Sequence, residues 1–289
     1  MPNVYEIMTE RILKLLENGI LPWRREWNFS DGMPRNFDSK HHYKGYNLLY
    51  LAIAQMLEGW QYPLYLTYIG ARRHGWNVKK GEEGNAVVFW KTTEIIEKDP
   101  KTGEERTKRQ GILRYYHVFN LDQIEGWRKE DLHLPERAPI PTCEELITSF
   151  VPNLPEIRHG APGYYPARDV ITLPNLEEFK EEAFYYTTRF HETVHATGAK
   201  HRLARPGIVE SNNFGDDEYS LEELIAEIGA AFLSAMSGIS TQVIEHNASY
   251  VQSWSEKLKD NPTWIVKAAS QAQKAVDFLL EEAKPDATP

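Results

Sequence analysis

The chain has 289 residues, of which 41% are hydrophobic and 12% aromatic, and it carries a formal net charge of −9. This composition excludes a disordered chain, and the length fits two domains or one large domain. The single cysteine, Cys143, excludes an internal disulfide and a cysteine-based zinc site, so any metal site must use histidine and carboxylate ligands. We expect Cys143 itself to be a buried hydrophobic residue rather than a nucleophile.

The sequence carries no membrane or export pattern. No stretch approaches the ~18 consecutive apolar residues of a membrane span. Charged residues such as Glu6, Glu10 and Arg11 interrupt the apolar runs of residues 1–30, unlike the apolar segment of a secretory signal peptide. Together with the single cysteine, these features predict a cytoplasmic protein with no membrane partner.

The first half of the chain contains three helical patterns followed by two β-rich runs. Apolar residues recur at helical spacing, with a glycine near the end of each pattern, over residues 4–18, 46–59 and, more briefly, 65–76. The β-rich runs, 85–99 and 110–124, flank a charged segment, which is typical of a hairpin with a long exposed loop.

A proline-dense stretch, residues 134–141, is the best linker pattern in the chain. We therefore predict an N-terminal domain over residues 1–133 and a C-terminal domain over residues 142–289. The two halves differ in charge, because residues 1–130 carry 20 Lys and Arg against 17 Asp and Glu, while residues 131–289 carry 13 against 25. Such asymmetry indicates two domains with different partners, and the basic one suits nucleic acid.

The second half is predicted to be mostly helical, with one short strand at residues 168–173 that a proline ends. In one of its helices, Ser220 and Glu223 have the spacing of an N-terminal capping box, and Gly238 marks the end. The predicted helices span residues 142–150, 175–198, 220–238 and 261–283.

Residues 191–195 read His-Glu-Thr-Val-His, an HExxH motif within a helical pattern. Two histidines four residues apart lie on one face of a helix, so both imidazoles can bind one metal ion. Glu192 is offset by one residue, where it can take the proton of a water activated by the metal. We predict His191 and His195 as ligands and Glu192 as a general base, although so short a motif also arises by chance on exposed helices.

A catalytic zinc site needs a third protein ligand. We favour Glu223, which a later helix would deliver as a carboxylate in the manner of gluzincins. The alternative is His201, because residues 191–201 fit the HExxHxxGxxH spacing of metzincins. Glu227, one helical turn after Glu223, is predicted to hydrogen-bond a ligating histidine. Zinc is the preferred metal for two histidines and a glutamate, although manganese or cobalt would also fit.

Other residues of the second half could support such a site. Small side chains beside the two glutamates would let their helix approach the histidine helix closely. Strand 168–173 resembles the edge strand with which zincin-like folds pair an extended peptide. Three tyrosines could stabilise a developing oxyanion, although each is more often a packing residue: Tyr164, Tyr165 and Tyr219.

Aromatic and basic residues alternate in segments of the first half that we predict to be loops. Single-stranded nucleic acid is bound by this combination, because bases stack on aromatic faces and cations follow the phosphates. For Trp90 and Tyr115, inside the β-rich runs, we prefer a place in the core. The predicted nucleic-acid-binding residues are Trp23, Arg24, Arg25, Trp27, Arg35, Lys40, Tyr43, Lys44, Tyr46, Arg72, Arg73, Lys79 and Lys80.

Over nearly its whole length, the sequence resembles the ArdC-type antirestriction proteins carried by conjugative plasmids and related mobile elements. The resemblance rests on ILPWRREW and YKGYNLLYL in the first half and on ARDVITLP, FHETVHATG and YSLEELIAEIGAAFL in the second. It implies an α+β protein with an N-terminal α/β domain that binds single-stranded DNA and a C-terminal zincin-like metallopeptidase domain. It further implies that His191, His195 and Glu223 hold the metal, that Glu192 is the general base, and that incoming DNA is shielded from host restriction.

Three hypotheses of function remain open from the sequence. The leading one is an antirestriction protein that binds single-stranded DNA and carries a metal-dependent peptidase site. The first alternative is a non-enzymatic protein that coats single-stranded DNA and has a structural metal site. The second is a metalloprotease that cleaves a protein bound to DNA, with a peptide substrate that the sequence does not identify. A DNA mimic is disfavoured, because the first half is basic and aromatic.

Overall fold

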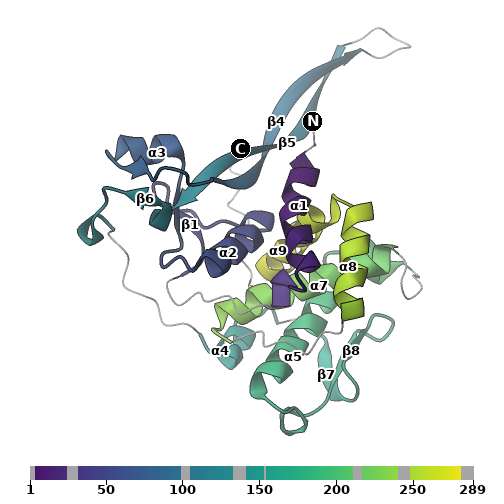
Figure 1. Cartoon of the computed structure of the whole chain (residues 1–289). Helices are drawn as coiled ribbons and strands as arrows, with labels where there is room; N and C mark the ends of the chain where they lie inside the picture. Colours follow the sequence, from purple (N-terminus) through teal and green to yellow (C-terminus); the bar gives the residue numbers. More distant parts are fainter. Residues whose placement is uncertain are drawn as a thin grey trace.

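The structure is a computed structural model that describes residues 4–24, 32–98, 105–132, 141–152, 154–210, 217–239 and 248–280 (Figure 1). It combines helices with three small sheets, which confirms the predicted α+β class. None of the helices in these ranges is long and apolar enough to cross a membrane.

The predicted helices of the first half are present. Helix α1 spans Val4–Glu17 and α2 spans Tyr46–Glu58, where Gly59 at a positive φ of 66° ends the helix as the sequence indicates. The third helix, α3, is shorter than its pattern and covers Tyr68–Arg73. A single 3-10 turn, η1, covers Pro22–Arg24 between α1 and the first strand.

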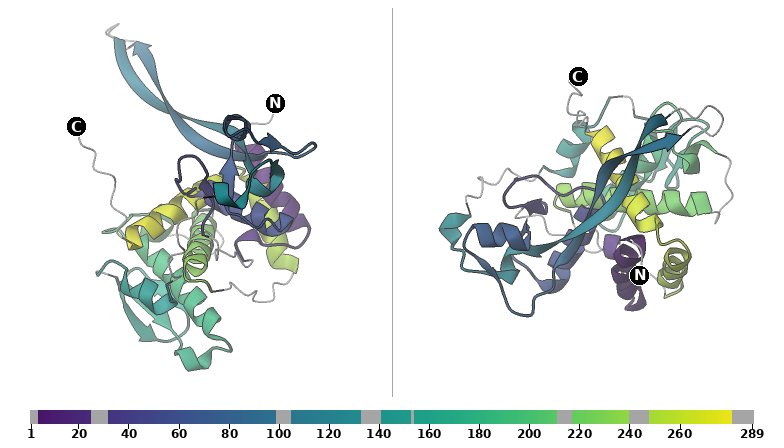
Figure 2. Two further views of the ribbon diagram at one scale, coloured as in Figure 1. Left: turned by 90° about the vertical axis from the view of Figure 1, so that its left-hand side faces the viewer. Right: turned by 90° about the horizontal axis from the view of Figure 1, so that it is seen from above.

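One sheet of four strands runs through the first half in the order β1-β2-β5-β4. Its long members, β4 and β5, form the predicted hairpin, which rises as a twisted ribbon from the rest of the molecule (Figures 1 and 2). A separate two-stranded sheet pairs β3 with β6. The bounds are β1 Arg35–Asn36, β2 Leu64–Leu66, β3 Asn77–Val78, β4 Asn85–Lys98, β5 Glu105–Asn120 and β6 Ile124–Glu125.

The hairpin is longer than the sequence predicted. Strand β5 begins at Glu105, so residues 105–109 are strand rather than exposed loop, and residues 99–104 lie outside the described ranges. The register places residues of opposite charge across from each other, Glu94 opposite Arg109 and Glu97 opposite Arg106. Residues 105–109 are mostly charged, so a search for apolar alternation does not detect this part of the strand.

The second half is built around three long helices and a three-stranded sheet in the order β7-β9-β8. The predicted strand is β9, and the sequence analysis missed its two neighbours and helix α8. Two 3-10 turns, η2 (Leu121–Gln123) and η3 (Lys129–Asp131), end the first half, and a third, η4 (Leu176–Glu178), precedes α5. The elements are α4 Cys143–Thr148, β7 Glu156–His159, β8 Gly163–Tyr165, β9 Val170–Leu173, α5 Glu182–Thr197, α6 Pro206–Val209, α7 Asp217–Met236, α8 Ala248–Asp260 and α9 Trp264–Leu279.

Two predicted helix starts were wrong. Helix α7 begins at Asp217, so Ser220 lies inside the helix, where its buried hydroxyl accepts a hydrogen bond from the Lys257 ammonium group. The capping-box spacing at Ser220 therefore does not mark the N-terminus. Helix α5 begins at Glu182 rather than at residue 175, because the 3-10 turn η4 takes up the start of that pattern.

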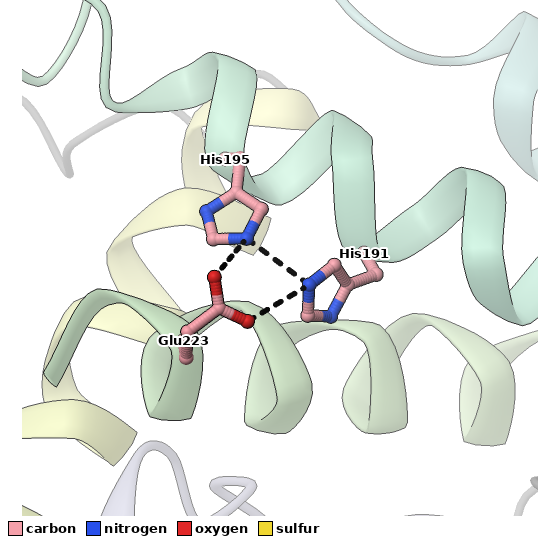
Figure 3. Close-up of side chains that lie close together, drawn as sticks. All are labelled: His191, His195 and Glu223. Carbon is pink, nitrogen blue, oxygen red and sulfur yellow. Dashed lines mark hydrogen bonds and ion pairs between the residues drawn. The ribbon is translucent and has the colours of Figure 1, made fainter. Parts of the chain in front are cut away.

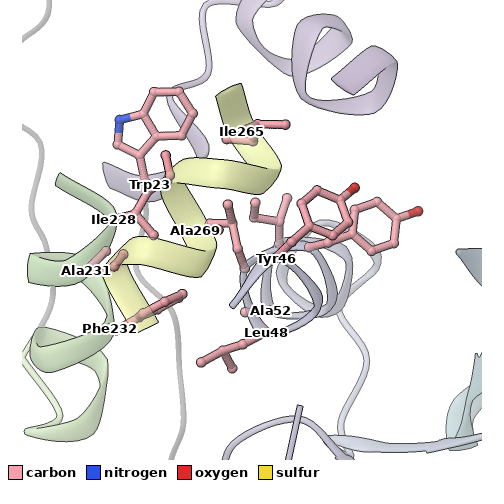
Figure 4. Close-up of a cluster of buried hydrophobic side chains, with 14 of the residues drawn as sticks. Trp23, Tyr46, Leu48, Ala52, Ile228, Ala231, Phe232, Ile265 and Ala269 are labelled. Carbon is pink, nitrogen blue, oxygen red and sulfur yellow. The ribbon is translucent and has the colours of Figure 1, made fainter. Parts of the chain in front are cut away.

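The larger of two hydrophobic clusters among the described residues contains residues from both halves of the chain. Helix α1 packs against α8, and α2 packs against α9, which in turn lies along α7. Cys143 is buried at the edge of this core, where burial raises the pKa of its thiol, as expected for a packing residue. The predicted linker, residues 134–141, lies almost entirely outside the described ranges, so the domain boundary stays a prediction. Figure 4 shows side chains from both halves in contact: Trp23, Tyr46, Leu48, Ala52, Ile228, Ala231, Phe232, Ile265 and Ala269.

Candidate metal centre

Helices α5 and α7 cross closely because small residues line the contact. A Cβ atom added at Gly229 would lie 2.8 Å from Cγ2 of Val194, so only glycine fits at this point of α7. Ala226 and Ala230 on either side are also buried. The prediction that small residues allow close approach is confirmed, and the approach brings the side chains of α7 up to the HExxH segment of α5.

Three side chains converge where the two helices meet (Figure 3). The Nε2 atoms of His191 and His195 lie 3.0 Å apart, and the carboxylate of Glu223 faces both. Its oxygens lie 3.6 Å from Nε2 of His191 and 3.5 Å from Nε2 of His195. One donor atom from each of the three residues falls within 4.8 Å of the others, an arrangement that can hold a metal ion.

A buried ion-pair network fixes the orientation of His195. Its Nδ1 atom lies 3.1 Å from the carboxylate of Glu222, which leaves Nε2 directed at Glu223 and His191. Arg205 holds Glu222 in turn, because its Nε and Nη2 donate to the two carboxylate oxygens at 2.8 and 2.7 Å. Further hydrogen bonds tie Arg205 to the hydroxyl of Thr197 and to the main-chain carbonyl of Val194.

Glycine makes room for this arginine. A Cβ atom at Gly198, the residue that follows α5, would meet the Arg205 guanidinium at 2.9 Å and the Ile208 side chain at 2.6 Å. The glycine that the sequence analysis treated as a helix stop therefore also allows the loop after α5 to fold back over the helix end.

The charges in the site favour an ionised carboxylate facing the two imidazoles. Burial by itself would raise the pKa of Glu223, but the hydrogen bond from His191 and the charges of His195 and His191 lower it to about 2. Burial would likewise raise the pKa of Glu222, which Arg205 and His195 instead hold below its usual range. The pKa of His195 is raised despite its burial, because Glu222 and Glu223 stabilise the imidazolium.

The donor set fits a divalent metal ion. Two imidazole nitrogens and one carboxylate make three protein ligands, which is the number that catalytic zinc sites use. Histidine and carboxylate ligands also suit manganese and cobalt, so the residues alone do not select one metal. Glu192, between the two histidines on α5, is buried and is not itself part of the converging group.

The tyrosines predicted near the site have different positions. Tyr219 hydrogen-bonds Glu223, and burial together with that carboxylate raises the pKa of Tyr219 to about 12. The Tyr164 hydroxyl donates to Asp169 at 2.8 Å and is not part of the converging group. Tyr165 is exposed on strand β8.

His201 does not join the two histidines of α5. Its Nε2 atom lies 3.4 Å from the carboxylate of Asp169, and its side chain is 62% exposed. The same carboxylate accepts two hydrogen bonds of 2.8 Å from Arg202. The metzincin-like spacing therefore corresponds to a loop anchored on Asp169, whereas Glu223 faces the imidazoles.

Glu227 does not contact either histidine, contrary to the prediction. It lies farther along α7, where its carboxylate accepts hydrogen bonds from the indole of Trp23, from Arg24 and from the Tyr250 hydroxyl. The residue beside His195 is Glu222, which the sequence analysis missed. Glu222 directly precedes the favoured ligand, and neighbouring residues on a helix point about 100° apart. The sequence analysis considered only residues one helical turn from Glu223, so it did not select Glu222.

Three of the aromatic residues predicted to stack on bases are inside the protein. Trp23, Tyr43 and Tyr46 are at most 8% exposed and fill the core, so their faces are closed to a ligand. Trp27 and Arg25 lie outside the described residues.

The predicted basic residues divide into paired and open ones. Arg24 is bound to Glu227, Lys44 pairs with Asp277 at 3.1 Å, and Arg35 is half-buried. Lys40 is exposed, with its ammonium group 4.2 Å from the centre of the Phe37 ring. The remaining four are exposed in and after α3: Arg72, Arg73, Lys79 and Lys80.

Two aromatic residues that we expected in the core are instead open. Trp90 is 61% exposed and Tyr115 is 41% exposed, and both lie on the β4–β5 hairpin. Aromatic residues occur on both faces of these strands, so the sequence pattern does not indicate which of them pack in the core and which are exposed.

Comparison with known proteins agrees with the two-part organisation. The family model of the N-terminal domain of anti-restriction factor ArdC matches residues 2–119, and that of a zincin-like metallopeptidase matches residues 144–271. The protein y4eC of Sinorhizobium fredii is 34% identical over 286 residues, which are 96% of this chain and 91% of y4eC. Two DNA primases TraC of Escherichia coli are 31% and 30% identical, and the chain spans only 27% and 20% of their lengths.

Two crystal structures of the antirestriction protein ArdC from plasmid R388 are similar to this structure over almost their whole length. The metal-free form has a TM-score of 0.75 at 35% identity, covering 97% of both chains. The Mn(II)-bound form has a TM-score of 0.75 at 34% identity, covering 99% of this chain and all of the other. The chain thus belongs to the ArdC family of antirestriction proteins, with an ArdC N-terminal domain followed by a zincin-like metallopeptidase domain.

Proposed function

We propose that the protein binds single-stranded DNA through its N-terminal half and hydrolyses peptide bonds at a metal site in its C-terminal half. Both activities would serve the protection of incoming DNA from host restriction. The observation that carries the peptidase part is the convergence of His191, His195 and Glu223 beside a buried glutamate, Glu192. Family membership supports the antirestriction role.

Each residue of the proposed metal centre would have a distinct role. His191, His195 and Glu223 would hold the ion, and we propose zinc or manganese because a Mn(II)-bound structure exists for ArdC of plasmid R388. A metal held there supplies Lewis acidity, which polarises a peptide carbonyl and makes water more acidic. Glu192 would accept the proton of the attacking water and pass it to the leaving amine.

The surrounding residues would keep this geometry. Glu222, held by Arg205, would fix the ring of His195, and the hydroxyl of Tyr219 would hold the Glu223 carboxylate by donating a hydrogen bond to it. A protein or peptide substrate is proposed on the zincin-like resemblance alone, and the chemistry of the site does not select its sequence.

The exposed cations in and after α3 support the DNA-binding part. Arg72, Arg73 and Lys80 are open to solvent, and phosphate groups are bound by such cations without sequence preference. Trp23, Tyr43 and Tyr46 are buried and would take no part in DNA contact.

Glu192→Gln tests the peptidase part. In the metal-loaded protein, cleavage of fluorescent casein is expected to fall by roughly 10²- to 10⁴-fold, the usual contribution of a general base. Metal content, measured by mass spectrometry, is expected to stay the same, and so is the affinity for a fluorescent oligothymidine. His201→Ala is the matched control, because it alters the far end of the same motif without touching the three ligands.

The same experiment separates the rival functions. Undiminished cleavage by Glu192→Gln would rule out the proposed role of Glu192. If no metal form of the wild-type protein cleaves casein, and chelation unfolds the protein, the metal is structural and the peptidase proposal is wrong.

A further inference from the structure

Two partly exposed aromatic side chains, Phe89 and Tyr116, lie close together on the β4–β5 hairpin. Phe89 is 42% exposed and Tyr116 38%, and their ring centroids lie 5.6 Å apart in an edge-to-face arrangement. Burying rings in the core is strongly favourable, so two adjacent aromatic rings that are each left partly exposed indicate a binding surface.

The register of the hairpin places these rings on the same face as two cations. Phe89 pairs with Arg114, Lys91 pairs with Ile112, and Tyr116 pairs with Val87, and directly paired residues of an antiparallel ribbon point to one side. We call this face, defined by Phe89, Lys91, Arg114 and Tyr116, the aromatic-cationic face. Lys91 and Arg114 are both exposed, and neither forms an ion pair with a carboxylate among the described residues.

The opposite face of the hairpin has a different environment. Trp90 and Tyr115 belong to it, and the Trp90 ring rests against Gly111, where an added Cβ would come within 3.3 Å. Trp90 also lines a cavity of about 460 Å³ together with Pro206 and Ile225 of the second half. Trp90 therefore borders a cavity that the second half also lines, and its ring is largely exposed.

We propose that the aromatic-cationic face of the hairpin is a binding surface for single-stranded DNA, with bases stacked on Phe89 and Tyr116 and phosphates held by Lys91 and Arg114. This inference rests on the proposed DNA-binding function and assigns it to a surface that the sequence analysis did not select. Partly open rings next to cations that pair with no described carboxylate suit unstacked bases on a phosphate backbone, whereas a duplex keeps its bases covered by stacking.

The surface also resolves a conflict in the predicted residues. Of the rings expected to stack on bases, Trp23, Tyr43 and Tyr46 are buried and Trp27 lies outside the described residues, so no described member of that set offers an open face. The hairpin supplies open rings, and its base joins the sheet that leads to Arg72 and Arg73 through β2 and α3.

Fluorescence anisotropy with a labelled 20-nucleotide oligothymidine tests the surface on the full-length protein. Phe89→Ala and Tyr116→Ala are each expected to weaken binding about tenfold, because one stacked base is lost with each ring. Lys91→Gln and Arg114→Gln are each expected to lower the slope of log affinity against log salt concentration by about 0.7, the value for one phosphate contact on a single strand. Tyr115→Ala, an equally exposed tyrosine on the opposite face, is the matched control and is expected to bind as the wild type does.

The outcomes distinguish the surface from the function. If the wild type binds and the Phe89→Ala/Tyr116→Ala double variant binds equally well, this surface assignment is wrong while DNA binding stands. A loss for Tyr115→Ala as large as for Tyr116→Ala would also overturn the choice of face. If the wild type itself binds no oligothymidine, the proposed DNA-binding function fails and the inference with it. Circular dichroism spectra that match the wild type establish that the variants fold.

Discussion

At the scale of single residues, Glu222 links the ring of His195 to Arg205, a role that its position in the sequence does not indicate. Its carboxylate is almost fully buried and joins two buried groups, the guanidinium of Arg205 and the ring of His195. A buried charge is tolerated only when it is paired, so the three groups depend on one another. The ring of His195 is oriented by this pairing and not by the helix alone.

Glu222→Gln is therefore expected to damage both stability and metal binding. The neutral amide leaves the Arg205 charge uncompensated, which should lower the free energy of unfolding by about 3 kcal/mol in the metal-free protein. Metal affinity is expected to fall roughly 10- to 100-fold, as when an outer partner of a ligating histidine is lost. Thermal unfolding and competition with a metal indicator measure the two effects.

Glu218→Gln provides the control for this prediction. Glu218 lies one turn earlier on the same helix and is exposed, so the identical change there should leave both quantities as in the wild type. Equal metal affinity in Glu222→Gln and the wild type would mean that the Glu222 pairing does not position His195.

At the scale of elements, the site depends on how closely α5 and α7 approach. The proposed ligands come from two helices, so a shift of one helix against the other separates Glu223 from the imidazoles. Gly229 of α7 faces Val194 of α5, which lies one residue before the second histidine of the motif. The contact sets the spacing that the three ligands require.

Gly229→Ala is expected to destabilise the protein despite the better helix propensity of alanine. Overpacking against Val194 costs about 1–3 kcal/mol, and the gain in helix propensity returns at most about 1 kcal/mol. In a Val194→Ala background the clash is removed, so the same change should become neutral or stabilising. Urea unfolding of the four proteins gives the coupling energy. An equal cost in both backgrounds would show that the two residues do not determine the helix spacing.

At the scale of the whole molecule, the N-terminal segment is tied to the metal-site helix. The carboxylate of Glu227 on α7 accepts hydrogen bonds from the indole of Trp23, the guanidinium of Arg24 and the hydroxyl of Tyr250 on α8. Burial and the Glu227 charge raise the pKa of Tyr250, so this hydroxyl stays protonated and donates. The two halves share this polar cluster as well as a continuous hydrophobic core.

Glu227→Ala is expected to lower the free energy of unfolding by about 3 kcal/mol, because it leaves several buried donors and the Arg24 charge without an acceptor. Metal affinity is expected to be unchanged, since Glu227 contacts none of the three ligands. Unfolding in urea and metal titration of the refolded protein check the two statements. A fall in metal affinity as large as that of Glu222→Gln would restore the role that the sequence first suggested for Glu227.

Much of the local structure could be predicted because it depends on local patterns. The periodicity of residues 4–18 and 46–59 gave α1 and α2 almost to the residue, since each helix has a glycine just after its end. Helix α8 and strands β7 and β8 were missed. The β7 side chains are exposed, so the strand has no apolar alternation to detect. The i, i+4 spacing of the histidines likewise predicts that they share a helix face, whatever the rest of the fold.

By itself, the sequence determined the helices and strands with strong patterns, the pairing of two histidines on one helical turn, and the need for a ligand other than cysteine. Only the tertiary structure decided that Glu223, and not His201, lies beside those histidines. It also determined the different partners of Glu222 and Glu227, the burial of Trp23 and the exposure of Phe89. The physical reason is that these outcomes depend on contacts between elements far apart in the chain. Periodicity places a side chain on a face of its own element but does not say which element will cover that face.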